Sequence, residues 1–162
     1  MHPNDQDVSH ADAAALIQTD GFRNSDSELE RNSSMARPKI RVLLADDCEQ
    51  IRQIIVKFLG ESPDIEIAGE ASNGRVAVEL TKLLVPDVVV MDIDMPEMNG
   101  IEATRIIRNS LPQVEVVGLS VNDDADRRNA ILKAGAADFV SKSEPLDVVM
   151  TAIRTCVLAR RC

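Results

Sequence analysis

The sequence predicts an α/β fold: a doubly wound, five-stranded parallel sheet with helices on both faces and the strand order 2-1-3-4-5. Three observations support this prediction. From Ile40 onward, short apolar runs alternate with segments of helical periodicity, and short polar connections separate them. The run at 88–91 is rich in β-branched side chains, which is typical of a strand buried on both faces of a sheet. Because strand–helix–strand crossovers are right-handed, successive units build one parallel sheet.

Five strands are expected. The first run ends directly before Asp46. The second alternates apolar and polar residues, which predicts weaker burial at a sheet edge. In chain order, the expected strands cover residues 40–45, 65–72, 88–91, 114–120 and 137–141.

Five helices are expected to follow these strands. The first places its apolar side chains on one face. Asn99 is expected to begin the third, Gly135 closes the fourth, and Pro145 is expected in the first turn of the last. The expected helices cover residues 48–59, 75–84, 101–108 and 123–134, and a last helix in which Leu146, Val149, Ile153 and Val157 recur at helical spacing.

Composition excludes several classes of function. The net charge of −9 argues against a nucleic-acid surface, because phosphate binding requires clustered Lys and Arg. The basic pairs Arg127-Arg128 and Arg160-Arg161 are too small to provide one. No apolar run is long enough to span a bilayer, and no basic-then-apolar signal stands at the start. We therefore expect a cytoplasmic protein that binds neither nucleic acid nor membrane.

Histidine and cysteine positions narrow the function further. Both histidines, His2 and His10, lie in the first ten residues. A folded domain without His cannot run a Ser-His-Asp or Cys-His mechanism. Cys48, Cys156 and Cys162 show no CxxC spacing and no nearby His, which predicts reduced thiols rather than a metal site or a disulfide framework.

Residues 1–38 differ in composition from the rest of the chain. They carry seven acidic residues against three arginines, and they lack apolar periodicity. Such a segment cannot bury enough apolar surface to offset the entropy lost on ordering, so a disordered acidic N-terminal tail is predicted. Met35 offers an alternative start of the chain. The folded domain is expected at residues 39–162.

Polar side chains follow four of the expected strands at the points where these strands end. Asp46 and Asp47 follow the first strand, Asp92 the third, Ser120 ends the fourth, and Lys142 follows the fifth. In the order 2-1-3-4-5, the first and third strands are neighbours at the switch point, where open α/β sheets bind ligands. Each residue alone could be a helix cap or a solvated strand end. Their joint occurrence at four strand ends favours a site.

Carboxylates that converge in this way raise one another's pKa unless a positive charge intervenes. A hard divalent cation such as Mg²⁺ takes oxygen ligands and is typically held by one or two carboxylates. Lys142 adds a fixed positive charge, and Ser120 adds a hydroxyl donor. Carboxylate, Mg²⁺, Lys and hydroxyl together are what phosphoryl transfer to an Asp requires.

The segments LLADD, VVVMDIDMPEMNGIEATR, GLS and DFVSK resemble, in this order and at these separations, the receiver domain of two-component response regulators. MDIDMPEMNG is a highly specific motif of that family. GEASNG and KAGAADFVSK further resemble receivers of the branch that usually carries a C-terminal helix-turn-helix DNA-binding domain. The resemblance covers residues 39–159 and implies the flavodoxin- and CheY-like form of the predicted fold.

The resemblance also implies roles for the strand-end residues. Asp92 would be the phosphoacceptor, and Lys142 would pair with the phosphoryl group. Asp47 would bind Mg²⁺ together with Asp92 and the backbone carbonyl of Asp94, and Asp46 would assist through water. Ser120, in place of the commoner Thr, would be the switch hydroxyl.

Phe139 falls at the family's switch aromatic position, although a Phe there could equally be a core residue. The resemblance implies that Phe139 rotates inward on phosphorylation and that the surface of the fourth helix, fifth strand and fifth helix then changes. Val148, Val149 and Ile153 could belong to this surface or pack in the core.

Because the chain stops at Cys162, directly after the last helix, a stand-alone receiver is expected. It would not be an enzyme: it would take one phosphoryl group from a sensor histidine kinase or phosphotransfer protein and signal to a downstream target protein. Three alternatives remain. The chain could be a fragment of a DNA-binding transcriptional regulator, or a pseudo-receiver that is never phosphorylated. Asp92-Ile93-Asp94 also resembles the DxD motif of haloacid-dehalogenase-type phosphatases, but there the motif follows the first strand and a late acidic pair completes the site.

Overall fold

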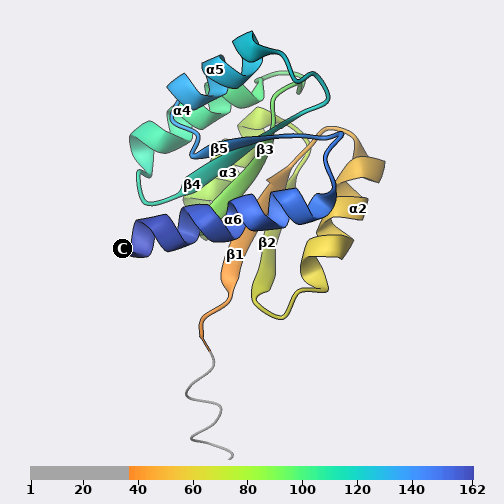
Figure 1. The fold of residues 1–162 in the computed structure, drawn as a ribbon. Coiled ribbons are helices and arrows are strands. Elements are labelled where there is room, and N and C mark those ends of the chain that lie inside the picture. The colour runs from red at the N-terminus through yellow and green to blue at the C-terminus, as the bar shows by residue number, and fades with distance from the viewer. Residues whose placement is uncertain (1–36) are drawn as a thin grey trace, which may run out of the picture. The chain divides into compact units, whose positions relative to one another are not determined.

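The computed structural model describes residues 37–162, so the predicted tail lies, apart from residues 37 and 38, outside the described residues. A five-stranded parallel sheet in the order β2-β1-β3-β4-β5 forms the centre of the described part (Figure 1). The fold class and strand order predicted from the sequence are confirmed. In chain order the elements are β1 (Ile40–Ala45), α2 (Glu49–Gly60), β2 (Ile65–Ala71), α3 (Gly74–Leu84), β3 (Val88–Asp92), α4 (Gly100–Ser110), β4 (Glu115–Ser120), α5 (Ala125–Lys133), β5 (Asp138–Ser141) and α6 (Leu146–Arg161).

Two apolar cores lie on the two faces of the sheet. Every residue of β3 is buried, and its side chains alternate between the cores: Val88 and Val90 face one, Val89 and Met91 the other. Helices α2 and α6 cover the first core, while α3 and α4 cover the second. Because both faces of β3 are covered, its sequence is a continuous apolar run and not an alternating one.

The second strand lies at a sheet edge, as its alternating sequence predicts. Most residues of β2 are only partly buried, and its pairing with β1 shifts register between Val42 and Leu43. The other edge is β5, a strand of four residues.

Helix starts follow the capping residues in the sequence. The side chains of Asn73, Asn99 and Asp124 each accept a hydrogen bond from a backbone N–H in the first turn of α3, α4 and α5. This cap places the start of α5 at Ala125, two residues later than predicted. The prediction for Pro145 is wrong: with ψ of 146°, it is extended and precedes α6, whose first residue is Leu146.

The sequence left three residues of α6 open between surface and core, and the structure places two of them in the core. Val149 and Ile153 are buried in the core with α2, and only Val148 of the three candidate surface residues is exposed. Among residues 37–162, no helix has the length and apolar character needed to cross a membrane.

Candidate functional site

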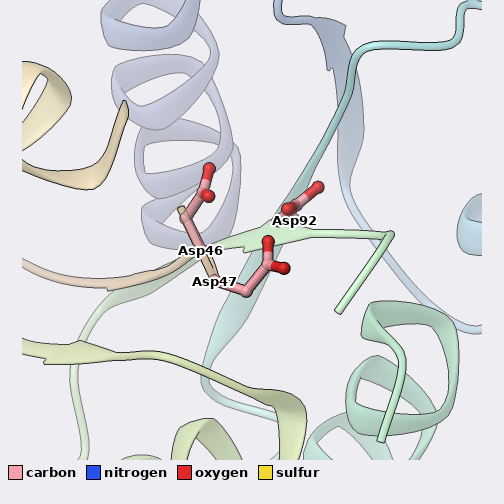
Figure 2. A group of neighbouring side chains, drawn as sticks. All are labelled: Asp46, Asp47 and Asp92. Atoms are coloured by element: carbon pink, nitrogen blue, oxygen red, sulfur yellow. The ribbon is translucent and has the colours of Figure 1, made fainter. Parts of the chain in front are cut away.

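Three carboxylates meet at the carboxyl end of the sheet. Asp46 and Asp47 follow β1, and Asp92 is the last residue of β3. Each offers an oxygen atom, and these oxygens all lie within 4.8 Å of one another (Figure 2). Asp46 and Asp92 are buried, whereas Asp47 is exposed and opens the cluster to solvent. The convergence predicted from the sequence is therefore present.

The parallel pairing of β1 and β3 produces this convergence. Ala45 pairs with Met91, so the next residue of each strand emerges at the same edge of the sheet. Gly100 then allows the chain to return beside Asp92. A Cβ at Gly100 would lie 2.0 Å from the carbonyl oxygen of Asp92, so no other residue fits without movement of the backbone.

Lys142 links the two buried carboxylates. Its Nζ lies 2.7 Å from Oδ2 of Asp46 and 3.0 Å from Oδ2 of Asp92. Its backbone N–H donates to the carbonyl of Ser120 at 2.8 Å, which ties the end of β5 to the end of β4. The amine of Lys142 thus reaches the ends of the first and third strands, although the residue follows the fifth.

Burial dominates the electrostatics of Asp92. The pKa of Asp92 is raised from the usual 3.8 to about 6, chiefly by desolvation and to a smaller extent by the charge of Asp46, against the hydrogen bond and charge of Lys142. Burial alone would lower the pKa of Lys142, but its bonds to Asp46 and Asp92 outweigh this and raise it. The lysine therefore stays charged. A further positive charge in the site would stabilise the ionised form of Asp92.

The donor set fits Mg²⁺. Lys142 pairs with two of the three carboxylates, which leaves two excess formal negative charges in the cluster for a divalent cation to balance. All the candidate ligands are oxygen atoms, which Mg²⁺ prefers. Oδ2 of buried Asp46 has no hydrogen bond beyond its ion pair with Lys142. Asp46, Asp47 and Asp92 are the residues of the described part that could hold the ion.

Ser120 lies at the rim of the site beside Asp94. Its buried Oγ is 3.5 Å from Oδ2 of Asp94 and accepts a hydrogen bond from the backbone N–H of Asn122 at 3.1 Å. Sequence reasoning missed the partner of Asp94, which is Arg127 of α5: its guanidinium binds both carboxylate oxygens. Arg127 also lies 3.2 Å from the capping carboxylate of Asp124.

Phe139 is buried against Ile93 and Ile131. The guanidinium carbon of Arg128 lies 5.2 Å from the centre of its ring, a cation–π arrangement. Ile131 is the only residue of α5 that is buried. The contacts of α5 with the rest of the domain therefore depend largely on this isoleucine and on the two arginines of its first turn.

A doubly wound domain with an acidic pair after its first strand, an aspartate at the end of its third and a lysine after its fifth has the architecture of a signalling receiver. The chain belongs to the response regulator receiver domain family, whose model matches residues 42–154. It is a receiver domain of a two-component response regulator.

Relatives with different activities share this domain. The chain is 34% identical over 123 residues to the transcriptional regulatory protein DegU of Brevibacillus brevis, covering 76% of this chain and 52% of DegU. It is 46% identical over 105 residues to a protein-glutamate methylesterase/protein-glutamine glutaminase of Alkalilimnicola ehrlichii, covering 64% of this chain and 27% of that protein. The chain thus spans about half the length of the first relative and less of the second, and the shared part is the receiver.

The fold matches solved receivers. The signal receiver domain of the response regulator NarL from Mycobacterium tuberculosis superposes with a TM-score of 0.72 at 30% identity, covering 75% of this chain and 98% of that chain. The match extends across nearly the whole of that receiver.

Proposed function

We propose that this chain is a phosphoacceptor of a two-component phosphorelay, which receives a phosphoryl group on Asp92 in a Mg²⁺-dependent reaction. The observation that supports this most strongly is the burial of Asp92 between Lys142 and two further carboxylates. A buried carboxylate with a raised pKa would be an unfavourable strand end without a chemical role.

The transfer is a displacement at phosphorus. A carboxylate oxygen of Asp92 attacks the phosphoryl group of a phosphohistidine, the bond from phosphorus to the donor nitrogen breaks, and an acyl phosphate forms. Lys142, already 3.0 Å from Asp92, stabilises the charge on the phosphoryl oxygens, and the Ser120 hydroxyl donates from the other side. Asp46, Asp47, Asp92 and the backbone carbonyl of Asp94 would hold Mg²⁺, which supplies charge neutralisation when bound.

Phosphorylation would bias a two-state element. It adds about one and a half to two negative charges next to Ser120 and Asp94. Ser120 would move toward the phosphoryl group, and the position of Phe139 would report the change to α5, β5 and α6. Phe139 is already buried in this structure. This is the position that the proposed switch would favour in the active state. A downstream target protein would read that surface.

The phosphodonor would dock on an apolar cavity beside Lys142. This cavity has a volume of about 470 Å³ and lies between α2, the end of β4 and the start of α6. At its border Ile54 and Val121 are 60% and 66% exposed. Because Lys142 is part of the lining, a protein seated there is next to Asp92. We assign the cavity to a sensor histidine kinase or phosphotransfer protein.

Intact mass after incubation with acetyl phosphate tests the chemistry. Wild-type protein is expected to gain one phosphoryl group with Mg²⁺ and none with a chelator, and Asp92→Asn should gain none. No gain in the wild type under either condition would refute phosphoacceptance. Continuous release of phosphate from simple esters would instead indicate a phosphatase, because a receiver takes up a single group.

A second experiment tests the docking cavity. Ile54→Glu should keep the gain from acetyl phosphate but slow transfer from a histidine-phosphorylated donor protein, since it places a charge on the apolar border. Leu83→Glu is the matched control, because Leu83 is 76% exposed on α3 and does not line the cavity. Equal donor rates for the two variants would contradict the assignment.

A further inference from the structure

A second, partly buried cation contacts the backbone of the acidic cluster. Arg52 of α2 is 14% exposed in its side chain, and its Nη1 donates to the backbone carbonyl of Asp46 at 2.7 Å. Its Nε donates to Oε2 of Glu70 on β2 at 3.1 Å. Gln53, the next residue of α2, donates to the same oxygen of Glu70 at 2.8 Å. Arg52 therefore connects the first helix, the edge strand and the backbone of the acidic cluster.

This contact completes the fixation of Asp46. The backbone N–H of Asp46 donates to Ala71 at 3.0 Å, Oδ1 accepts from the N–H of Cys48 at 2.9 Å, and Oδ2 pairs with Lys142 at 2.7 Å. The carbonyl oxygen that Arg52 binds belongs to the peptide joining Asp46 to Asp47. Arg52 thus sets the orientation of this peptide plane.

Asp47 depends on that orientation. Within residues 37–162, no side chain donates a hydrogen bond to its carboxylate or forms an ion pair with it, and Asp47 is exposed. No side-chain contact in the described part of the chain holds this carboxylate in the cluster, so its position depends on the backbone that carries it. Rotation of the preceding peptide would carry it away from the other two carboxylates.

We propose that Arg52, held by Glu70, is a positioning residue for the metal-binding carboxylates. The proposal rests on the proposed function, since it needs Mg²⁺ to bind at Asp46, Asp47 and Asp92. Residues that orient metal ligands without touching the metal typically change affinity by about 10- to 100-fold when replaced. We therefore expect Arg52→Gln to weaken Mg²⁺ binding by about 10- to 100-fold.

Isothermal titration calorimetry with Mg²⁺ alone measures this directly. Arg52→Lys should bind Mg²⁺ more tightly than Arg52→Gln, because a lysine can keep a hydrogen bond to the Asp46 carbonyl although it loses the contact with Glu70. Glu70→Ala, which removes the partner shared by Arg52 and Gln53 but leaves the bond from Arg52 to the Asp46 carbonyl, should weaken binding less than Arg52→Gln. These two variants also keep the test usable if Arg52→Gln does not fold.

Arg154→Gln is the matched control. Arg154 of α6 is bound by Asp64 and Ser62, away from the carboxylate cluster, so its loss tests general destabilisation. Its Mg²⁺ affinity should equal that of the wild type. A second readout separates positioning from chemistry: in Arg52→Gln, the rate of phosphorylation by acetyl phosphate should recover at saturating Mg²⁺.

The outcomes are distinguishable. If the wild type binds no Mg²⁺, the metal site of the proposed function is refuted. If the wild type binds and the Arg52 variants bind equally well, only the role of Arg52 is refuted. Equal weakening in Arg154→Gln, or a rate in Arg52→Gln that stays low at saturating Mg²⁺, would also overturn the positioning role.

Discussion

Replacing Asp92 by Asn should stabilise the protein, and the gain should depend on pH. Burial raises the pKa of Asp92 from 3.8 to about 6, so the folded state binds this proton more tightly than the unfolded state does. The contribution of Asp92 to the free energy of unfolding of the wild type is therefore fully present below about pH 4, and it is lost as the pH rises through about 6. A difference of about two pKa units corresponds to about 3 kcal/mol. Asparagine does not titrate.

Urea unfolding at about pH 4 and pH 7 would measure this effect. Far-UV circular dichroism is the suitable probe because the chain has no Trp or Tyr. A chelator must be present, since bound Mg²⁺ would neutralise Asp92. The stability of Asp92→Asn minus that of the wild type should rise by up to about 3 kcal/mol between the two pH values. Glu79→Gln, at an exposed position of α3, should show almost no change. A difference for Asp92→Asn that is equal at both pH values would refute the electrostatic reasoning.

Three further substitutions test separate parts of the structure. Val85 caps α3 in the left-handed conformation, with φ of 43° and ψ of 65°, so Val85→Gly should raise the free energy of unfolding in urea by about 1 kcal/mol. Gly100→Ala should lower it by about 2 kcal/mol or more and abolish phosphorylation in the intact-mass assay, because the new Cβ would collide with the Asp92 carbonyl; unchanged stability would contradict this packing. Arg127→Gln removes the ion pair with Asp94 and should speed amide hydrogen exchange in α5 while exchange in α3 stays the same. Equal exchange in α5 would show that the ion pair does not hold the helix.

Local patterns were sufficient to predict the fold. The run at 88–91 predicts a strand covered on both faces, and β3 is buried at every residue. The alternation at 65–72 predicts an edge strand, and β2 lies at the edge. These predictions succeed because hydrophobic periodicity is set by burial, and burial is the main term that selects a register.

The candidate site was only partly predictable. Strand order places Asp46, Asp47 and Asp92 together, since the ends of neighbouring parallel strands meet at one edge. The contacts of Arg127 and Arg52 could not be predicted from the sequence. Each arginine reaches its partner through a long flexible side chain, and the direction of that side chain depends on tertiary packing. The spacing of apolar residues in α6 also did not show which of its faces is buried, so the sequence could not place Val149 and Ile153 in the core or on the surface.

The attachment of the helices indicates where a charge change at Asp92 would have its largest effect. Helix α6 buries five residues in the core, whereas α5 buries one, Ile131. Moving α6 would expose several apolar side chains, each worth about 1.5–3 kcal/mol of burial. Moving α5 mainly breaks the bonds of Arg127 and Arg128, which are partly exposed and weak. Arg127 forms an ion pair with Asp94, two residues from the proposed phosphoacceptor. Helix α5, which buries the fewest residues, is therefore also electrostatically coupled to the site. The response to phosphorylation should therefore begin at the first turn of α5.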